Sequence, residues 1–396
     1  MSLGIYISVP FCRTKCSYCN FASDVFSRAV FERYVDRVCT DIACADRIAT
    51  EMSGQIERLV DSVYLGGGTP TVLDPDQLRR VFDAVRAKFS VLPNAEVTVE
   101  CAPGTLSPQV LETLLHCGVN RVSLGVQSFI DRESAAVGRL HKRDTILDDI
   151  SRLRAAGVSN INIDLIAGLP HQTAESWKES LAETVATGVP HVSVYMLEVD
   201  DDSRLGRELI AGGTRYHAHF VPDEDAVADF YVVACEALDT AGVKQYEISN
   251  FARSGFESLH NLKYWTRQPY LGFGVDSHSM LPSIEPKSDA VRFAAVDALE
   301  KYTAGDPLRK TEVAQASALE ERFFLGLRLN HGVDLREIER TCGHGALDSY
   351  RPAISELIDL GLLDRRGESI CLTPQGRLLS NEVFQRFLAT VNSAKV

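Results

Sequence analysis

Three cysteines stand close together near the start of the chain, at Cys12, Cys16 and Cys19, in the spacing CxxxCxxC. A loop with this spacing can wrap around one corner of an iron–sulfur cubane, so that each thiolate binds one iron and the fourth iron lacks a protein ligand. A chelating amino acid can then bind the open iron through its amine and carboxylate and receive an electron. The spacing therefore predicts a [4Fe-4S] cluster with an open coordination site.

A zinc site is the alternative for these thiols. Structural zinc takes four ligands, normally as two CxxC or Cys/His pairs, and no second pair follows in this sequence. Asp24 or a distant histidine could in principle complete such a site, so zinc stays open at this point. The other seven cysteines are scattered singly, which is typical of buried thiols in a reducing compartment.

The composition is that of a folded protein without an evident nucleic-acid surface. The chain has 396 residues, is 45% hydrophobic and carries a formal net charge of -13. The acidic balance argues against a nucleic-acid partner, because phosphate neutralisation requires clustered Lys and Arg. We find no apolar run long enough for a membrane span and no basic leader, so we expect a cytoplasmic location.

The elements that must position the cysteines form an alternating series. Short β-type runs alternate with amphipathic segments over the first 250 residues, which indicates an α/β protein built from parallel βα units. The expected strands are residues 5–9, 62–65, 96–100, 121–126, 160–165 and 191–195. The expected helices include residues 75–89, 108–117, 145–156, 175–187 and 223–240.

The last third of the chain changes character. We expect residues 1–280 to form the large body, with 246–279 mostly loop, and residues 281–310 to be a connection. Residues 311–396 then form a small domain. Helices over 311–329, 334–341 and 351–360, followed by a turn at 365–368 and a strand at 370–372, indicate a mostly helical, winged-helix-like unit. A cap without a ligand of its own is the favoured role for this unit.

Several longer strings carry a resemblance to a known family. They are YISVPF at 6–11, GGGTP at 66–70, VSLGVQSF at 122–129, NIDLIAGLP at 162–170 and YEISNF at 246–251. With the cysteine loop, they make the chain resemble the radical S-adenosylmethionine (SAM) superfamily. Within it, the chain is similar to the oxygen-independent coproporphyrinogen III oxidase group and its HemW-type haem-chaperone branch. This resemblance implies an incomplete (β/α)6 barrel that binds SAM at the cluster.

The resemblance also implies a set of SAM-binding residues near the carboxyl ends of the expected strands, where α/β barrels build their sites. These are Tyr6, Gly67, Gly68, Thr69, Glu100, Gln127, Arg139 and Asp164. Glycines let backbone approach a ligand, a guanidinium can fork onto a carboxylate, and carboxylates can accept from ribose hydroxyls or an amine. For each residue alone, a structural hydrogen bond is the alternative. We predict no catalytic residue, because the cofactor would carry the chemistry.

Two features separate a haem carrier from an oxidase within this group. The oxidases have a further cysteine two residues after the third, where this chain has Phe21, and HNLKYW at 260–265 matches the HNxxYW string of the haem-binding relatives. The resemblance therefore implies haem contact by His260, Tyr264 and Trp265, with ordinary structural roles as the alternative. His278 has the same two interpretations with less support.

Our functional hypothesis is a haem chaperone that binds haem or another porphyrin and passes it to an acceptor protein. The rival hypothesis is radical decarboxylation of coproporphyrinogen III, and a radical SAM enzyme acting on RNA is disfavoured by the acidic charge. A homodimer is a possible state that the sequence does not argue for.

Overall fold

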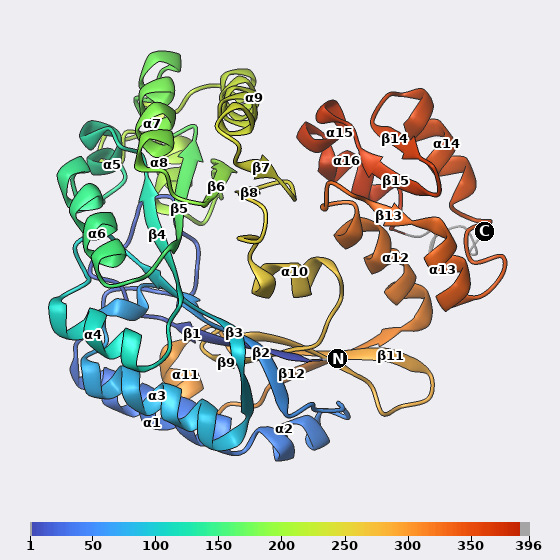
Figure 1. The fold of residues 1–396 in the computed structure, drawn as a ribbon, viewed down its shortest axis with the longest axis horizontal. Helices are drawn as coiled ribbons and strands as arrows, with labels where there is room; N and C mark the ends of the chain where they lie inside the picture. Colours follow the sequence, from blue (N-terminus) through green and yellow to red (C-terminus); the bar gives the residue numbers. More distant parts are fainter. Residues whose placement is uncertain (1, 389–396) are drawn as a thin grey trace.

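The computed structural model describes residues 2–388. Its centre is one curved sheet of twelve strands in the order β12-β11-β10-β9-β1-β2-β3-β4-β5-β6-β8-β7. The sheet curves like a barrel but stays open, and the helices of the first half lie on its outer face (Figure 1). A smaller domain follows at the C-terminal end of the chain, to the right in Figure 1.

The six expected strands are all present and run parallel to one another in chain order. They are β1 (Leu3–Val9), β2 (Leu59–Gly67), β3 (Ser90–Cys101), β4 (Arg121–Gln127), β5 (Asn160–Ala167) and β6 (His191–Met196). In β1, Leu3, Ile5 and Ile7 are fully buried, while Tyr6 between them is only partly buried. Alternation of this kind sends the apolar side chains into the layer between sheet and helices and leaves the other set for the barrel interior.

The helices of the large body connect these strands and cover the outside of the sheet. They are α1 (Ala29–Ala43), α2 (Ala45–Glu51), α3 (Pro75–Lys88), α4 (Pro108–His116), α5 (Asp131–Ala136), α6 (Arg143–Ala155), α7 (Ala174–Thr187), α8 (Arg204–Ala211) and α9 (Glu224–Thr240). Local sequence explains where several begin: Asp74 and Gln77 form a capping box at α3, and Ser107 caps α4 before its Pro108. The open, incomplete barrel expected from the sequence is therefore confirmed.

The segments expected as loop and connection contain much of the remaining sheet. The loop 246–279 includes β8 (Asn250–Ala252), α10 (Leu259–Trp265) and β9 (Tyr270–Gly274), and β9 pairs in parallel with β1. The connection 281–310 overlaps β10 (His278–Pro282), β11 (Ser288–Ala294), α11 (Leu299–Ala304) and β12 (Arg309–Ala314). The loop character expected for 246–279 was wrong, and the segment expected as a connection contains strands, because β9 to β12 extend the sheet beyond β1. Short β7 (Lys244–Gln245) and β8 extend it beyond β6.

The C-terminal domain combines helices with a three-stranded sheet, where the sequence predicted helices, a turn and one strand. Its helices are α12 (Gln315–Gly326), α13 (Leu335–Cys342), α14 (Arg351–Asp359), α15 (Pro374–Leu378) and α16 (Ser380–Gln385). Its strands β13 (Val333–Asp334), β15 (Ser369–Leu372) and β14 (Leu363–Arg366) are antiparallel, and the expected turn joins β14 to β15 at Gly367. The helix expected from residue 311 begins at Gln315, because the preceding residues belong to β12.

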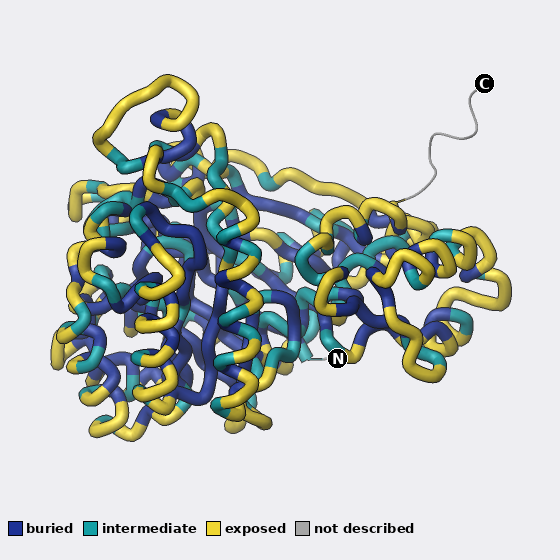
Figure 2. Tube along the Cα trace, turned by 90° about the horizontal axis from the view of Figure 1, so that it is seen from above, coloured by how far each residue is buried: buried dark blue, intermediate teal, exposed yellow. Residues whose placement is uncertain are grey.

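Two separate hydrophobic cores hold the two domains. The large core lies between the sheet and its helices, and a second core includes Phe323, Ile354 and Phe387 of the C-terminal domain. Figure 2 shows the buried strands of the large body on one side and the smaller domain beside it. Contacts near α10 join the two: the Arg328 guanidinium stacks on Trp265, 4.2 Å from the ring centroid. Within residues 2–388, no helix has the length and apolar character needed to cross a bilayer.

Candidate functional site

The cysteine loop follows β1 directly and is anchored at several points. The Cys12 amide donates to the Asp24 carbonyl at 3.0 Å, and the Asp24 amide donates to Pro10 at the same distance, so the loop closes on itself. The Lys15 ammonium donates to the carbonyl of Ser23 at 2.6 Å, and Thr14 Oγ1 donates to the Gly138 carbonyl at 3.0 Å. These bonds fix the loop over the carboxyl end of the sheet.

The three expected thiols line one cavity. Cys12, Cys16 and Cys19 are free, partly exposed and share the lining of a cavity of about 390 Å³. In the described part of the chain, no three His, Cys, Asp or Glu side chains are arranged to hold a single metal ion. A cubane takes one thiolate on each of three irons and leaves the fourth iron open. Three thiols around one cavity therefore fit an iron–sulfur cluster.

Most of the residues expected to bind SAM lie in the same cavity. Its lining includes Gly67, Gly68, Thr69, Glu100, Gln127, Arg139 and Asp164. Tyr6 lies in a neighbouring cavity that shares the two glycines with the first. His260 and Trp265 line neither cavity, and Tyr264 lines the second. The sequence thus predicted most of the lining of the main cavity, but it did not distinguish the residues of the main cavity from those of the second one.

The glycine turn after β2 packs closely against the cysteine loop. The Gly68 amide donates to the Val9 carbonyl and the Thr69 amide to the Phe11 carbonyl, each at 2.7 Å. A Cβ at Gly68 would lie 2.6 Å from the Phe11 carbonyl oxygen and 3.1 Å from Cys12 Sγ. Gly67 has a φ of +99° and its amide donates to Glu100 at 3.1 Å. The glycines therefore bring two backbone segments together beside the thiols.

Two carboxylates face the cavity from neighbouring strands. Glu100 of β3 accepts hydrogen bonds from Tyr64 at 2.9 Å and from Gly67, and Asp164 of β5 accepts from Ser123 at 3.0 Å and from Asn162. Burial, together with the charge of Asp164, raises the pKa of Glu100 to about 7, and burial also raises the pKa of Asp164. Carboxylates destabilised in this way gain from a ligand that donates hydrogen bonds or brings a positive charge.

A guanidinium and an amide with unused hydrogen-bonding capacity also line the cavity. Arg139 donates to the Tyr18 hydroxyl at 3.2 Å, but its buried Nε has no partner in residues 2–388. The buried Oε1 of Gln127 also has no partner there. Unsatisfied buried polar atoms are costly and mark the place where a polar ligand binds. The cavity therefore offers a group that can bind a carboxylate and groups suited to an amine and hydroxyls, which matches the polar groups of SAM.

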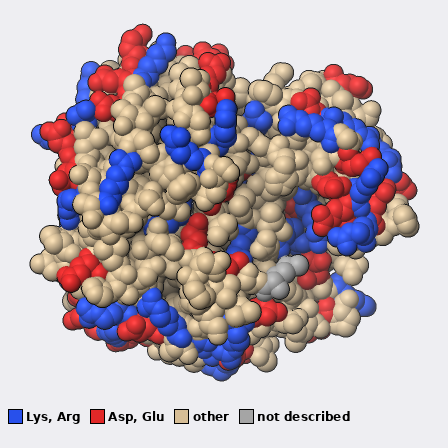
Figure 3. Space-filling view, viewed as in Figure 1, with Lys and Arg blue, Asp and Glu red and all other residues tan. Residues whose placement is uncertain are grey.

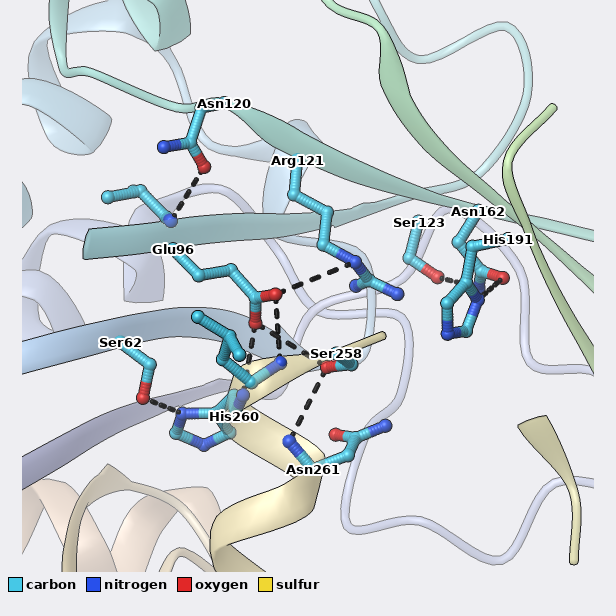
Figure 4. A network of polar contacts seen from close by, with 12 residues as sticks. Ser62, Glu96, Asn120, Arg121, Ser123, Asn162, His191, Ser258, His260 and Asn261 are labelled. Carbon is cyan, nitrogen blue, oxygen red and sulfur yellow. Dashed lines mark hydrogen bonds and ion pairs between the residues drawn. The ribbon is translucent and has the colours of Figure 1, made fainter. Parts of the chain in front are cut away.

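His260 lies at the opposite, amino-terminal end of the barrel interior. Its ring nitrogens contact Ser62 Oγ at 3.0 Å and the Tyr264 hydroxyl at 2.9 Å, and the side chain is almost fully buried. Burial lowers its pKa to about 3. Figure 4 shows Glu96 beside it, accepting from the backbone amides at the start of α10, with Arg121 4.0 Å away. Both ring nitrogens are occupied, so His260 as placed has none left for haem iron.

The cavity lining also includes residues that the sequence analysis did not assign to the site, among them Tyr64, Ser123, His141 and Tyr195. Three of them sit at inward positions of β2, β4 and β6, two residues apart from other inward side chains, so strict alternation along each strand could have found them. His141 Nε2 donates to the Val126 carbonyl at 3.1 Å, and burial lowers the pKa of His141 to about 4. It therefore faces the cavity as a neutral ring.

The surface seen in Figure 3 carries both signs of charge. Lys and Arg are interspersed with Asp and Glu around the rim of this face, and its middle is mostly uncharged. Because a phosphate backbone requires a continuous basic stripe, this face does not have the charge pattern of a nucleic-acid surface.

Two family models match the chain. That of the Radical SAM superfamily matches residues 6–183, and that of the HemN C-terminal domain matches residues 313–379. The first extends from β1 into α7 and contains the cysteine loop, and the second contains most of the C-terminal domain.

Curated relatives match over nearly the whole length. The heme chaperone HemW of Lactococcus lactis is 34% identical over 387 residues, which cover 97% of this chain and 96% of that relative. The heme chaperone HemW of Bacillus subtilis is 33% identical over 386 residues, covering 97% and 98%. Among solved structures, coproporphyrinogen III oxidase (HemN) from Escherichia coli has a TM-score of 0.82, with 24% identity, over 98% of this chain and 90% of that one. That likeness shows a common fold.

Proposed function

Because the chain belongs to the radical SAM superfamily and, within it, to the family of the HemW haem chaperones, we propose that it binds haem and delivers it to an acceptor protein. The observation that carries the proposal is the match to relatives named heme chaperone, which extends over 97% of this chain at 33–34% identity. The C-terminal domain lies within the matched length, so the likeness includes more than the cofactor-binding half.

The main cavity would hold a [4Fe-4S] cluster on Cys12, Cys16 and Cys19 together with one molecule of SAM. Together they would supply one-electron reductive chemistry. The chain contributes the binding groups: thiols that each reach a different iron, the Arg139 guanidinium for a carboxylate, and Glu100 with the Gly67 backbone for amine and hydroxyl groups.

The oxidase alternative has less support. Its structural counterpart shares the fold at 24% identity, whereas the HemW proteins of Lactococcus lactis and Bacillus subtilis are 34% and 33% identical over 97% of this chain. Phe21 occupies the position where the oxidases carry a further cysteine, and its ring is 66% exposed beside the cavity mouth. An exposed aromatic side chain there can contact an apolar cargo or a partner protein.

The state of the cysteines also indicates the cellular compartment of the protein. All ten cysteines are free, which fits a reducing environment such as the cytoplasm, because secreted proteins keep their cysteines in disulfides.

The experiment that tests the proposal is an anaerobic titration of the cluster-reconstituted protein with haemin, followed by absorbance. A parallel reaction with coproporphyrinogen III, SAM and dithionite is analysed for decarboxylated product. We expect near-stoichiometric haem binding, transfer to apomyoglobin as a probe acceptor, and no product. Product formation without stable haem binding would make the protein an oxidase.

A further inference from the structure

A second cavity, of about 330 Å³, lies beside the cluster cavity. The two share Phe21, Ser23, Gly67 and Gly68, so only the glycine turn and the end of the cysteine loop separate them. The remaining wall of the second cavity is made by Tyr6, Ser8, Pro10, Ala22, Tyr264, Tyr270, Asp276 and His278. Apart from Asp276 and His278, this lining has no charged or titratable group other than tyrosine.

His278 is the one imidazole on this wall. It begins β10, and its side chain is 66% exposed. No hydrogen bond to its ring is found within residues 2–388, and the nearest acid is Asp276, whose Oδ1 lies 3.9 Å from Nε2. A carboxylate behind an imidazole orients the ring and makes its other nitrogen a better metal ligand. The geometry therefore leaves one nitrogen of His278 available at the cavity edge.

The other walls suit a flat aromatic macrocycle. Tyr264 and Tyr270 meet edge to face, with ring centroids 4.6 Å apart and an interplanar angle of 87°. Phe21, which lines both cavities, is exposed. Aromatic rings of this kind bind a porphyrin through stacked and edge contacts. The cavity is too small for a whole macrocycle to be enclosed, so part of it would stay accessible to an acceptor.

Arg309 stands in register with His278 across two strand pairings. His278 pairs with Ala294 of β11, and Ala294 pairs with Arg309 of β12, so the three side chains project from the same face of the sheet. Arg309 is exposed and lies two strand spacings, about 10 Å, from His278. Ala294 between them is small and buried. A guanidinium at this position can bind a propionate carboxylate.

We propose that the second cavity holds the haem, with His278 as the iron ligand, Tyr264 and Tyr270 against the ring, and Arg309 toward a propionate. The assignment rests on the proposed haem-carrier function and specifies its site. It places the cargo directly beside the cluster cavity, with the glycine turn between them.

The assignment gives the HNxxYW motif an indirect role. His260 contacts the Tyr264 hydroxyl at 2.9 Å and so positions that ring on the cavity wall, while Trp265 packs under Arg328 of the C-terminal domain. His260 is therefore a positioning residue for the haem site, and its replacement should alter affinity without changing the iron ligand.

The test compares haemin difference titrations of the wild type, His278→Ala and the control His344→Ala, whose histidine is exposed in the C-terminal domain. We expect His278→Ala to weaken binding about tenfold or more and to change the Soret band to that of a protein lacking the imidazole ligand. Added imidazole should restore the wild-type spectrum. His344→Ala should behave as the wild type.

Two further variants separate ligation from folding. His278→Met should bind haem with a shifted spectrum, because a thioether replaces the imidazole, and His260→Gln should weaken binding while leaving the spectrum unchanged. If the wild type binds haem and His278→Ala keeps both affinity and spectrum, the site assignment is wrong while the carrier function stands. If the wild type binds no haem, the proposed function fails first.

Discussion

Replacement of Glu100 by Gln is expected to stabilise the SAM-free protein at pH 8, although Glu100 lies in the main cavity. The wild-type carboxylate accepts hydrogen bonds from the Tyr64 hydroxyl and the Gly67 amide. A glutamine can keep both contacts, because its oxygen accepts from Gly67 and the Tyr64 hydroxyl can turn to accept from the side-chain amide. The substitution therefore removes the charge with little loss of hydrogen bonding.

The magnitude follows from the pKa of Glu100, which burial and the charge of Asp164 raise from 4.5 to about 7. In the unfolded chain the Glu100 carboxyl ionises at its ordinary pKa of 4.5, whereas in the folded protein it ionises only near pH 7. That pKa difference corresponds to a cost of about 3 kcal/mol. Because Glu100 faces the cavity, water there reduces the cost, and we expect a gain of about 1–3 kcal/mol for the glutamine variant.

The gain should depend on pH in one direction. Between pH 4.5 and 7 the folded state binds more protons at Glu100 than the unfolded state, so the wild type loses stability relative to the variant as the pH rises. The difference should be small near pH 4.5, grow through pH 5 and 6, and be complete above pH 7.

The assay is urea denaturation of wild type and variant followed by circular dichroism at pH 5, 6, 7 and 8 without SAM. Glu112→Gln, at an exposed position of α4, is the matched control and should show no such trend. Added SAM should stabilise the wild type more than Glu100→Gln. A variant less stable than the wild type at pH 8, or a difference that is constant across this range, would refute the reasoning.

Three other substitutions test the remaining parts of the site. Cys16→Ala should leave the reconstituted protein without cluster iron and sulfide. The control Cys342→Ala, at an exposed thiol in the C-terminal domain, should retain both. Retention of a full cluster by Cys16→Ala would contradict the ligand assignment. Gly68→Ala should destabilise the fold by about 1–3 kcal/mol in denaturation experiments, because its Cβ would lie 2.6 Å from the Phe11 carbonyl oxygen, and an unchanged midpoint argues against this packing. Arg139→Lys should weaken SAM binding about tenfold in calorimetry, because an ammonium cannot fork onto a carboxylate; equal affinity would remove Arg139 from the SAM site.

The sequence by itself determined the features that depend on near neighbours. The cysteine spacing lies within eight residues, so the cluster motif needs no knowledge of distant contacts. The six parallel strands could also be predicted from the sequence. Helices cover them, and each strand carries buried apolar residues, such as Leu3, Ile5 and Ile7 in β1. Since carboxyl ends of parallel strands meet at one edge, the shared location of Glu100 and Asp164 followed from the strand assignment.

The extension of the sheet was not legible for a physical reason. Strands β10 to β12 form its outer part, and β12 is exposed at all but one of its six positions. Edge strands of this kind carry charges and lack a regular apolar pattern, so the sequence resembled a connection. His278 stands at the start of β10, and its relation to Arg309 depends on pairing across three strands.

The position of His260 was decided by tertiary structure alone. Its motif predicted haem contact, but its partners Glu96 and Ser62 stand 164 and 198 residues earlier in the chain. A local string cannot show whether an imidazole faces a cavity or is buried, because the cost of burying the ring is compensated only when a distant partner such as Ser62 meets it in the fold. The sequence therefore identified the candidate site residues. The long-range packing of the barrel decided which of them line the main cavity, which line the second cavity and which are buried away from both.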